Sequence, residues 1–144
     1  MKDKNMSTIE IICDGGARNN QTPEKREAFG SFIIKPSPEL VPSPPIIHKR
    51  FYGNRTNNEA EYMALIDALT WIKEKYKYVD NLIIKTDSQL LIGHLSQGWR
   101  VKEPRLRELY TKASYLITDI VTHPLTEVKF EKIHEAEMKQ IIGH

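Results

Sequence analysis

The stretch NLIIKTDSQLLIGHLSQGW (Asn81–Trp99) joins a short apolar run directly to a helical pattern, and this junction indicates the fold class. The run NLIIKT is apolar on both faces, as expected of a strand at the centre of a covered sheet. Helical spacing begins at Ser88, so Asp87 stands where a buried strand gives way to a helix. This succession is typical of an α/β sheet. Asp87 is either the N-cap of that helix or part of a site at the strand end.

Hydrophobic periodicity and turn signals predict the other elements. The first strand ends at the turn signal DGGARNNQTPEK, and the prolines of PSPELVPSPP predict an exposed surface loop over residues 36–45. The predicted strands are 8–13, 29–35, 46–52, 81–86 and 125–133, and the predicted helices are 57–76, 88–96, 106–120 and a short one after residue 134. The order β-β-β-α-β-α-α-β-α predicts a single α/β domain over residues 1–144, in which we expect residues 1–7 to be disordered.

The composition bounds the class of protein. Hydrophobic residues make up 40% and charged residues 28%, an ordinary soluble balance, and the net charge of +2 is too small to indicate nucleic acid by itself. The single cysteine, Cys13, excludes a disulfide framework and is predicted to be a small core residue. No apolar run approaches the ~18 residues of a membrane span, and Met1–Ser7 has no signal-peptide core. We therefore expect a cytoplasmic protein that is a monomer without an obligate protein partner.

Three carboxylates are predicted to meet at one edge of the sheet. Asp14 follows the first apolar strand, and Asp87 follows the fourth in the same way. Sites in α/β sheets form at the carboxyl ends of strands, so these aspartates are candidate neighbours. Glu61 precedes Leu65 by four residues, which places it on the apolar side of its helix. Glu59 is expected to point elsewhere, into solvent.

The chemistry of such a cluster favours a divalent cation. A carboxylate facing a core costs several kcal/mol unless it is paired, protonated or bound to metal. Oxygen ligands suit Mg²⁺ or Mn²⁺, and two ions about 4 Å apart activate a water and stabilise a leaving oxygen in phosphodiester hydrolysis. Simpler interpretations remain open for each residue: Asp14 as a turn residue, Asp87 as a helix cap, and Glu61 as the partner of a lysine.

The motifs around these acids resemble those of a known family. CDGGARNN (residues 13–20), TNNEAEYMALIDAL (56–69) and KTDSQLLIGHLSQGW (85–99) are similar to the three core motifs of the type 1 ribonuclease H family, in the same order. The resemblance extends from about Thr8 to Ile133. The segment GWRVKEPRLRELYTKA (98–113) resembles the compact branch of that family, which lacks an extended basic protrusion. The resemblance implies a ribonuclease H-like five-stranded mixed sheet flanked by helices.

The resemblance also implies an activity and its residues. The protein would be an endonuclease that cuts the RNA strand of an RNA–DNA hybrid duplex with two Mg²⁺ or Mn²⁺ ions, and its metal ligands would be Asp14, Glu61 and Asp87. In this interpretation Gly15 and Gly16 let backbone approach the RNA strand, Thr56 lies near a DNA phosphate, and Asn57 and Asn58 contact the minor groove. Either asparagine is also a candidate cap of its helix.

A basic segment after the second predicted helix is a candidate for binding phosphates. Arg100 and Lys102, with Arg105 and Arg107, lie close to Trp99 in the sequence. Lysine and arginine side chains arranged in this way form a modest phosphate-binding surface. A solvated helix start is the alternative for the charges, and we expect Trp99 to pack against the sheet rather than to stack on a sugar.

The match fails at the fourth acid, which the family carries on the helix after the last strand. Aligning the family's usual context with HEAEMKQIIGH sets Glu135 on a conserved glutamate of the motif and Ile141 where the catalytic aspartate is expected. Glu137 lies one turn before Ile141 and is the predicted substitute. Otherwise a tail histidine (His134 or His144) assists, or the site binds metal poorly.

Two rival functions follow from this departure. The first is the same fold binding hybrids or RNA with weak or no cleavage. The second is a different nuclease on this fold, either an exonuclease or an enzyme that cuts DNA. The asparagines of TNNEAEY disfavour the second rival, because amide side chains that donate and accept hydrogen bonds suit 2′-hydroxyls and groove edges.

Overall fold

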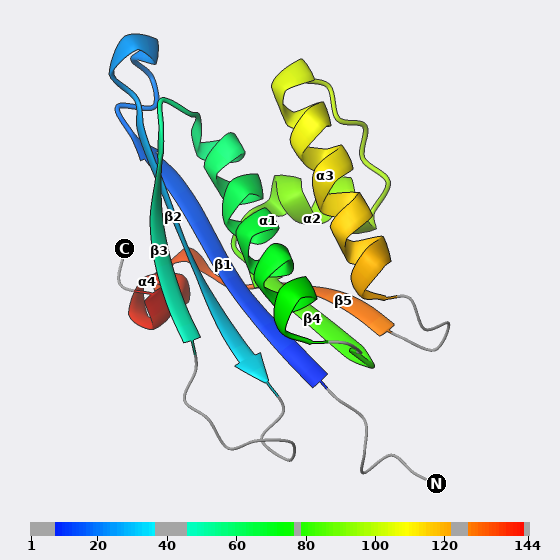
Figure 1. Ribbon diagram of the computed structural model, residues 1–144. Coiled ribbons are helices and arrows are strands. Elements are labelled where there is room, and N and C mark those ends of the chain that lie inside the picture. Colours follow the sequence, from blue (N-terminus) through cyan, green and yellow to red (C-terminus); the bar gives the residue numbers. More distant parts are fainter. Residues whose placement is uncertain (1–7, 37–45, 77–78, 122–126, 143–144) are drawn as a thin grey trace, which may run out of the picture.

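The computed structural model describes residues 8–36, 46–76, 79–121 and 127–142, and Figure 1 shows its elements. The predictions for residues 1–7 and for 37–45 of the proline-rich segment lie outside the described residues. The strands are β1 (Thr8–Arg18), β2 (Glu27–Pro36), β3 (Ile46–Gly53), β4 (Asn81–Thr86) and β5 (Glu127–Lys132). The α-helices are α1 (Asn57–Lys75), α2 (Gln89–Ser96), α3 (Pro104–Ile120) and α4 (Glu135–Ile142), and a short 3-10 helix, η2, spans Pro23–Lys25. The predicted order of strands and α-helices is confirmed.

The strands form one mixed sheet in the order β3-β2-β1-β4-β5. The pairs β1–β2 and β2–β3 are antiparallel, whereas β4 runs parallel to both β1 and β5. The predicted end of the first strand is wrong: β1 continues through DGGAR, because β2 pairs with it as far as Arg18 opposite Glu27. Asp14 therefore lies within β1 rather than after it. The parallel pairing of β1 with β4 nevertheless stops at Ile12 opposite Lys85, just before Asp14.

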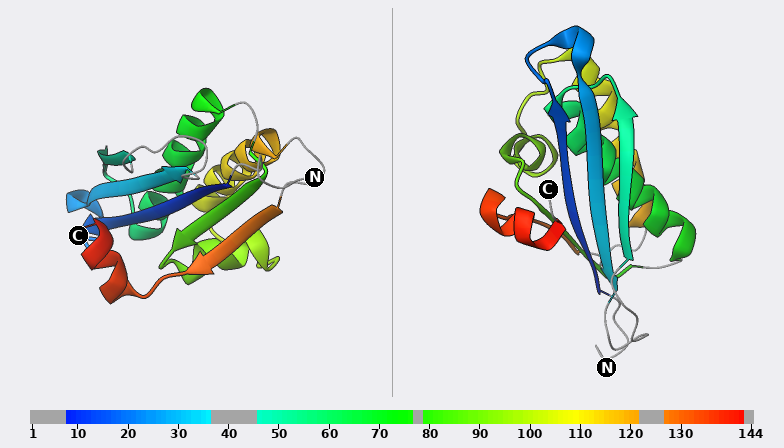
Figure 2. Two further views of the ribbon diagram at one scale, coloured as in Figure 1. Left: turned by 90° about the horizontal axis from the view of Figure 1, so that it is seen from below. Right: turned by 90° about the vertical axis from the view of Figure 1, so that its left-hand side faces the viewer.

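Helices cover both faces of the sheet, as Figure 2 shows: α1 and α3 lie on one side and α4 on the other. The larger core lies under α1, which buries a stripe of tyrosine, leucine, isoleucine and alanine side chains against β1, β2 and β4. Cys13 belongs to this core and is fully buried, as predicted. A smaller core joins Ile12 and Ile33 of the sheet to Met138 and Ile142 of α4. In the part of the chain that the structure describes, no helix is long and apolar enough to cross a membrane.

The start of α1 is held by a capping box. The Thr56 side chain accepts a hydrogen bond from the Glu59 N–H at 3.1 Å, and the Glu59 carboxylate accepts one from the Thr56 N–H at 2.9 Å. This reciprocal pair satisfies two of the backbone donors that a helix start leaves free. Thr56 is the N-cap, so the prediction that Asn57 or Asn58 caps this helix is wrong.

Candidate functional site

The structure brings Asp14, Glu61 and Asp87 together, and one carboxylate oxygen from each lies within 4.8 Å of the others. They come from β1, from the first turns of α1 and from the residue after β4. Extending the parallel register of β1 and β4 by two residues sets Asp14 level with Asp87. Glu61 reaches them because α1 crosses β1 at Gly15. A Cβ at Gly15 would lie 2.4 Å from the Ala60 carbonyl carbon, so a larger residue would push the helix and its glutamate away.

Burial raises the pKa of all three carboxyl groups, and the charges of neighbouring carboxylates add to the effect. Burial, followed by the charge of Asp87, raises the pKa of Asp14 to about 7. Burial also raises the pKa of Glu61 well above its usual value, and Asp14 and Asp87 add to this effect. The pKa of Asp87 is raised, chiefly by burial. The N–H of Gly15 donates a hydrogen bond to Asp14 and to Glu61, which lowers both pKa values but does not outweigh the burial.

The cluster fits a divalent cation. Its donors are carboxylate oxygens, which Mg²⁺ and Mn²⁺ prefer, and their spacing allows one ion to contact all three residues. Among the described residues no lysine, arginine or histidine forms an ion pair with Glu61 or Asp87. The charge of Lys132 lowers the pKa of Asp87 without an ion pair, but the pKa stays raised, and a bound cation would supply the further positive charge that the two residues lack.

The simpler interpretations of the acids do not describe this structure. The N-cap of α2 is Ser88, whose Oγ accepts a hydrogen bond from the Leu91 N–H at 3.1 Å, so Asp87 does not cap the helix. Asp14 lies within a paired strand and is not a turn residue. Glu61 has no lysine partner among the described residues, and its Oε2 accepts a hydrogen bond from the Thr86 Oγ1 at 3.5 Å.

The prediction that Glu59 points into solvent is wrong, because its side chain is buried. Its side chain is only 2% exposed and pairs with Arg55 at 3.1 Å and Arg105 at 3.7 Å. Burial by itself would raise the pKa of Glu59, but the Thr56 N–H and the two arginines outweigh it, and the pKa is lowered. The capping-box spacing of Thr56 and Glu59 is a local sequence signal for the hydrogen bond between them, but it does not specify the burial of Glu59 or its ion pairs with the arginines.

The helix α4 brings Glu135, and not Glu137, to the three acids. Glu135 lines the same cavity of about 440 Å³ as Asp14, Glu61 and Asp87. Glu137 does not line this cavity, and its charge instead contributes to the raised pKa of Lys85. The charge of Glu135 contributes to the raised pKa values of Asp14 and Asp87.

The alignment of the tail with the family motif is therefore wrong about which positions face the cavity. Ile141, set on the catalytic aspartate, packs against the small core instead. Lys139, one turn after Glu135, lines the cavity. His134 is exposed and His144 lies outside the described residues.

The two asparagines at the start of α1 lie on the rim of the acidic cavity. The Asn57 Oδ1 accepts a hydrogen bond from the Ala17 N–H at 2.5 Å, and the Asn57 N–H donates to Asn20 Oδ1 at 3.0 Å. Asn57 thus fastens the end of β1 to α1. Because one lone pair of its carbonyl is used in this way, its Nδ2 amide group is its main contact for a ligand.

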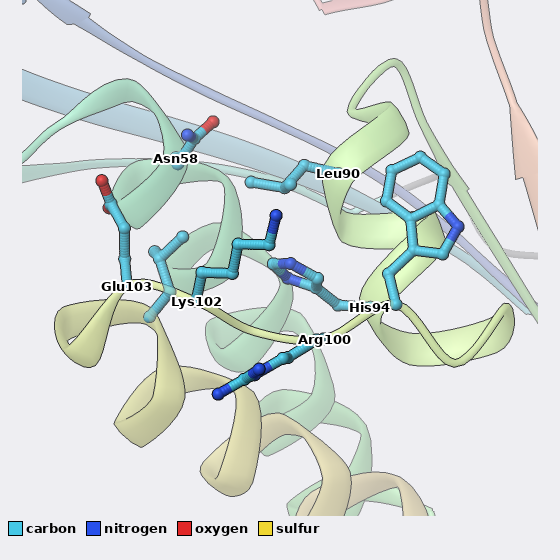
Figure 3. Close-up of a pocket in the computed structure, with 8 residues that line it drawn as sticks. Asn58, Leu90, His94, Arg100, Lys102 and Glu103 are labelled. Atoms are coloured by element: carbon cyan, nitrogen blue, oxygen red, sulfur yellow. The ribbon is translucent and has the colours of Figure 1, made fainter.

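A second cavity, of about 540 Å³, lies beside the acidic one and is shown in Figure 3. Arg100, Lys102, His94 and Trp99 line it, while Asn58 and Leu90 line both cavities and form a ridge between them. In Figure 3 Lys102 extends across the cavity toward Leu90 and His94. Glu103 also lines this second cavity, so its charged lining residues are one carboxylate and two cations, whereas the first cavity is lined mainly by carboxylates.

The remaining residues of the basic segment have structural contacts. Arg105 pairs with Glu59, and Arg107 donates to the carbonyls of Val101 and Lys102 at 2.9 and 3.1 Å. Trp99 is 44% exposed and packs on Gly93, where a Cβ would lie 2.2 Å from its ring. Packing was predicted for Trp99, although against the sheet rather than against α2.

Comparison with known proteins identifies relatives that match most of this chain. The family model described as reverse transcriptase-like matches residues 45–138. The chain is 36% identical over 120 residues to ribonuclease HI of Halobacterium salinarum, covering 83% of this chain and 56% of that protein. It is 31% identical over 109 residues to the bifunctional protein Rv2228c of Mycobacterium tuberculosis, covering 75% of this chain and 28% of that protein. The chain thus spans only part of the length of these relatives.

Solved structures agree with these relatives. The N-terminal RNase H domain of Rv2228c superposes with a TM-score of 0.75 at 26% identity, covering 92% of this chain and 91% of that one. LC11-RNase H1, solved in complex with an RNA/DNA hybrid, gives a TM-score of 0.74 at 27% identity, covering 92% and 89%. The resemblance inferred from the motifs is confirmed: this chain belongs to the reverse transcriptase-like family of ribonuclease H-like domains.

Proposed function

We propose that this protein is a metal-dependent endoribonuclease that hydrolyses the RNA strand of RNA–DNA hybrids. The observation that carries the proposal is the convergence of Asp14, Glu61 and Asp87, whose carboxylate oxygens lie within 4.8 Å of one another. Burial raises the pKa of all three acids, and neighbouring carboxylates raise those of Asp14 and Glu61 further, so their charges oppose folding unless a cation compensates them. Relatives named ribonuclease H support the nuclease assignment.

In this proposal Asp14, Glu61 and Asp87 hold Mg²⁺ or Mn²⁺. When bound, the metal supplies a Lewis acid that activates a water and stabilises the leaving oxygen of the phosphodiester. The resemblance implies two ions in the active complex. The protein's own part is to fix three oxygen ligands on a strand, a helix and a strand end, where packing restrains each of them.

The two cavities suit the two strands of a hybrid. The strand to be cut lies in the acidic cavity, which Gly15 lines beside the three acids. Gly16 does not line this cavity, and a Cβ there would lie 3.1 Å from the Phe29 ring. Arg100 and Lys102 contact phosphates of the DNA strand in the neighbouring cavity. The ridge between the cavities enters the minor groove.

The residues at the start of α1 complete this interface. Asn58 stands on the ridge, and Asn57 presents its Nδ2 group to acceptors such as the oxygen of a 2′-hydroxyl. Thr56, at the same helix start, lies near a DNA phosphate. A site that uses 2′-hydroxyls distinguishes the RNA strand from the DNA strand.

A second candidate function is a module that binds hybrids with little or no cleavage. The observation that favours it is on α4, where one of the two positions facing the acidic cavity holds Lys139 rather than a carboxylate. The cluster of Asp14, Glu61 and Asp87 argues against it, since binding alone does not need three mutually repelling acids.

Cleavage of a labelled RNA–DNA hybrid with Mg²⁺ or Mn²⁺ tests the proposal, with double-stranded RNA and double-stranded DNA as comparison substrates. We expect cleavage of the RNA strand of the hybrid only. Asp87→Asn should abolish it, whereas Asp119→Asn, which alters a surface pair with Lys73, should not. Retained binding without cleavage under either metal would establish the second candidate instead, and cleavage of double-stranded DNA would contradict both.

A further inference from the structure

Lys139 is the one lysine or arginine that lines the acidic cavity, among the residues that the structure describes. It shares that cavity with Asp14, Glu61, Asp87 and Glu135. A lysine ammonium is a compact point charge on a flexible stem with three donors, so it adapts to a phosphate oxygen or a carboxylate. In the proposed function the carboxylates hold the metal, and Lys139 has no role.

The packing of α4 explains why Lys139 lines the acidic cavity. Met138 and Ile142 are 1% and 5% exposed and pack on the small core, which sets the rotation of the helix about its axis. Successive residues of a helix are about 100° apart, so residues four apart share a flank. Glu135 and Lys139 therefore flank the buried side together. Glu137 lies about 200° around the axis from Glu135, which takes it out of the cavity.

The charges in the cavity indicate a role for the Lys139 ammonium. Four carboxylates share the cavity, and one divalent cation leaves part of their charge uncompensated. An ammonium beside Glu135 compensates a further part and repels a second divalent ion. A carboxylate at position 139 would do the opposite and complete a set of ligands for a second ion.

We propose that the active complex holds one divalent cation on Asp14, Glu61 and Asp87, and that the Lys139 ammonium supplies the second positive charge to the phosphate being cut. This inference rests on the proposed function and replaces the two ions implied by the resemblance with one. In the hydrolysis, the water oxygen bonds to phosphorus, the bond from phosphorus to the leaving oxygen breaks, and the water's proton ends on the leaving oxygen. Lys139 stays protonated throughout and acts on the charge of the transition state.

Counting bound Mn²⁺ tests the number of ions without relying on activity. The intact chain, with a hybrid whose RNA strand is 2′-O-methylated and resists cleavage, is titrated with Mn²⁺ and followed by electron paramagnetic resonance. We expect one ion per chain for the wild type and for Lys139→Met, and two ions, magnetically coupled, for Lys139→Asp. Two ions in the wild type would overturn the inference.

Kinetics test the charge of Lys139. Lys139→Met should lower kcat on the order of 100-fold with little change in KM, the loss typical of removing one preorganised charge. Lys129→Met, at a small cavity with Thr8 and Asn81, is the matched control and should leave kcat unchanged. Because the Lys139 side chain is exposed, its charge is screened by solvent and the melting temperature should change little. Wild-type kcat in Lys139→Met would refute the role.

The two proposals fail in different experiments. If the wild type cuts no hybrid under either metal, the nuclease assignment fails, whatever the number of bound ions. If it cuts hybrids while binding two Mn²⁺ ions, the nuclease assignment holds and the role of Lys139 is refuted.

Discussion

Glu59 and Glu61 are two residues apart on α1 and similarly buried, at 2% and 9% exposure, yet their surroundings are opposite. Glu59 faces Arg55 and Arg105 and accepts a backbone hydrogen bond, so its pKa is lowered. Glu61 faces Asp14 and Asp87, and its pKa is raised well above the usual value, chiefly by burial. Glu59 therefore stabilises the folded protein through its ion pairs. The folded protein holds Glu61 in surroundings that disfavour its charge.

The difference teaches that burial of a charge does not by itself indicate a site. A buried carboxylate with cationic partners is a structural ion pair, and its removal leaves charges uncompensated. A buried carboxylate facing other carboxylates needs protons or a cation. We therefore expect Glu61→Gln to lower activity and to raise the stability of the metal-free protein. We expect Glu59→Gln to keep most of the activity and to lower stability.

The largest expected effect is on catalysis. Glu61→Gln keeps the shape of the side chain but removes a metal ligand, and we expect hybrid cleavage to fall by about 10²–10³-fold or more. Glu59→Gln, the matched control two residues away, should keep most of the activity once folded. Single-turnover cleavage with saturating Mn²⁺ measures both. Comparable losses in the two variants would remove the distinction between them.

Metal binding should stabilise the wild type and Glu59→Gln but not Glu61→Gln. Binding to the folded state alone adds about 2.7 kcal/mol at a free metal concentration of 100 Kd. Thermal melts with Mn²⁺ and with EDTA measure this gain as a rise in Tm. Asp87→Asn should also lose the gain, since it removes another of the three ligands. An equal rise in Tm for Glu61→Gln would show that the metal binds elsewhere.

Stability without metal should change in opposite directions at the two positions. Glu59→Gln leaves two arginines without their carboxylate and should destabilise the protein by about 1–3 kcal/mol. Glu61→Gln removes a charge that repels Asp14 and Asp87 and should stabilise the metal-free protein by about 1 kcal/mol. Urea unfolding in EDTA at pH 8 measures both values. A destabilised Glu61→Gln protein would mean that the carboxylate forms contacts which offset its repulsion.

The smallest expected effect is the pH dependence of these differences in stability, which should differ between the two positions. The folded pKa of Glu61 is raised above its unfolded value, so the cost of its charge is complete above the folded pKa. The advantage of Glu61→Gln should shrink as the pH falls through the folded pKa and vanish at the unfolded value. The folded pKa of Glu59 is lowered, so its stabilisation is present above the unfolded value and is lost as the pH falls through the folded one.

Between pH 8 and 5, then, the advantage of Glu61→Gln should shrink while the deficit of Glu59→Gln stays constant. Each tenfold difference in proton affinity is worth about 1.4 kcal/mol. Unfolding curves in EDTA across this range provide the measurement. Parallel pH profiles for the two variants would contradict the opposite pKa shifts.

Much of this site could be predicted from local patterns. Helical spacing placed Glu61 on the buried side of α1, and the apolar run of β4 placed Asp87 at a strand end. The prediction for β1 was too short, because its continuation to Arg18 depends on pairing with β2. Glu59 was predicted to be solvated because one of its partners, Arg105, is 46 residues away along the chain.

By itself, the sequence determined the order of strands and helices, which follows from periodicity, and it indicated the three acids that meet, although Asp14 lies within β1 rather than after it. Only the tertiary structure decided which carboxylate is neutralised and which residues of α4 face the cavity. The neutralisation depends on α3 bringing Arg105 to Glu59, and the rotation of α4 depends on Met138 and Ile142 packing on the sheet. Such contacts join segments distant in sequence, so no local pattern of residues specifies them.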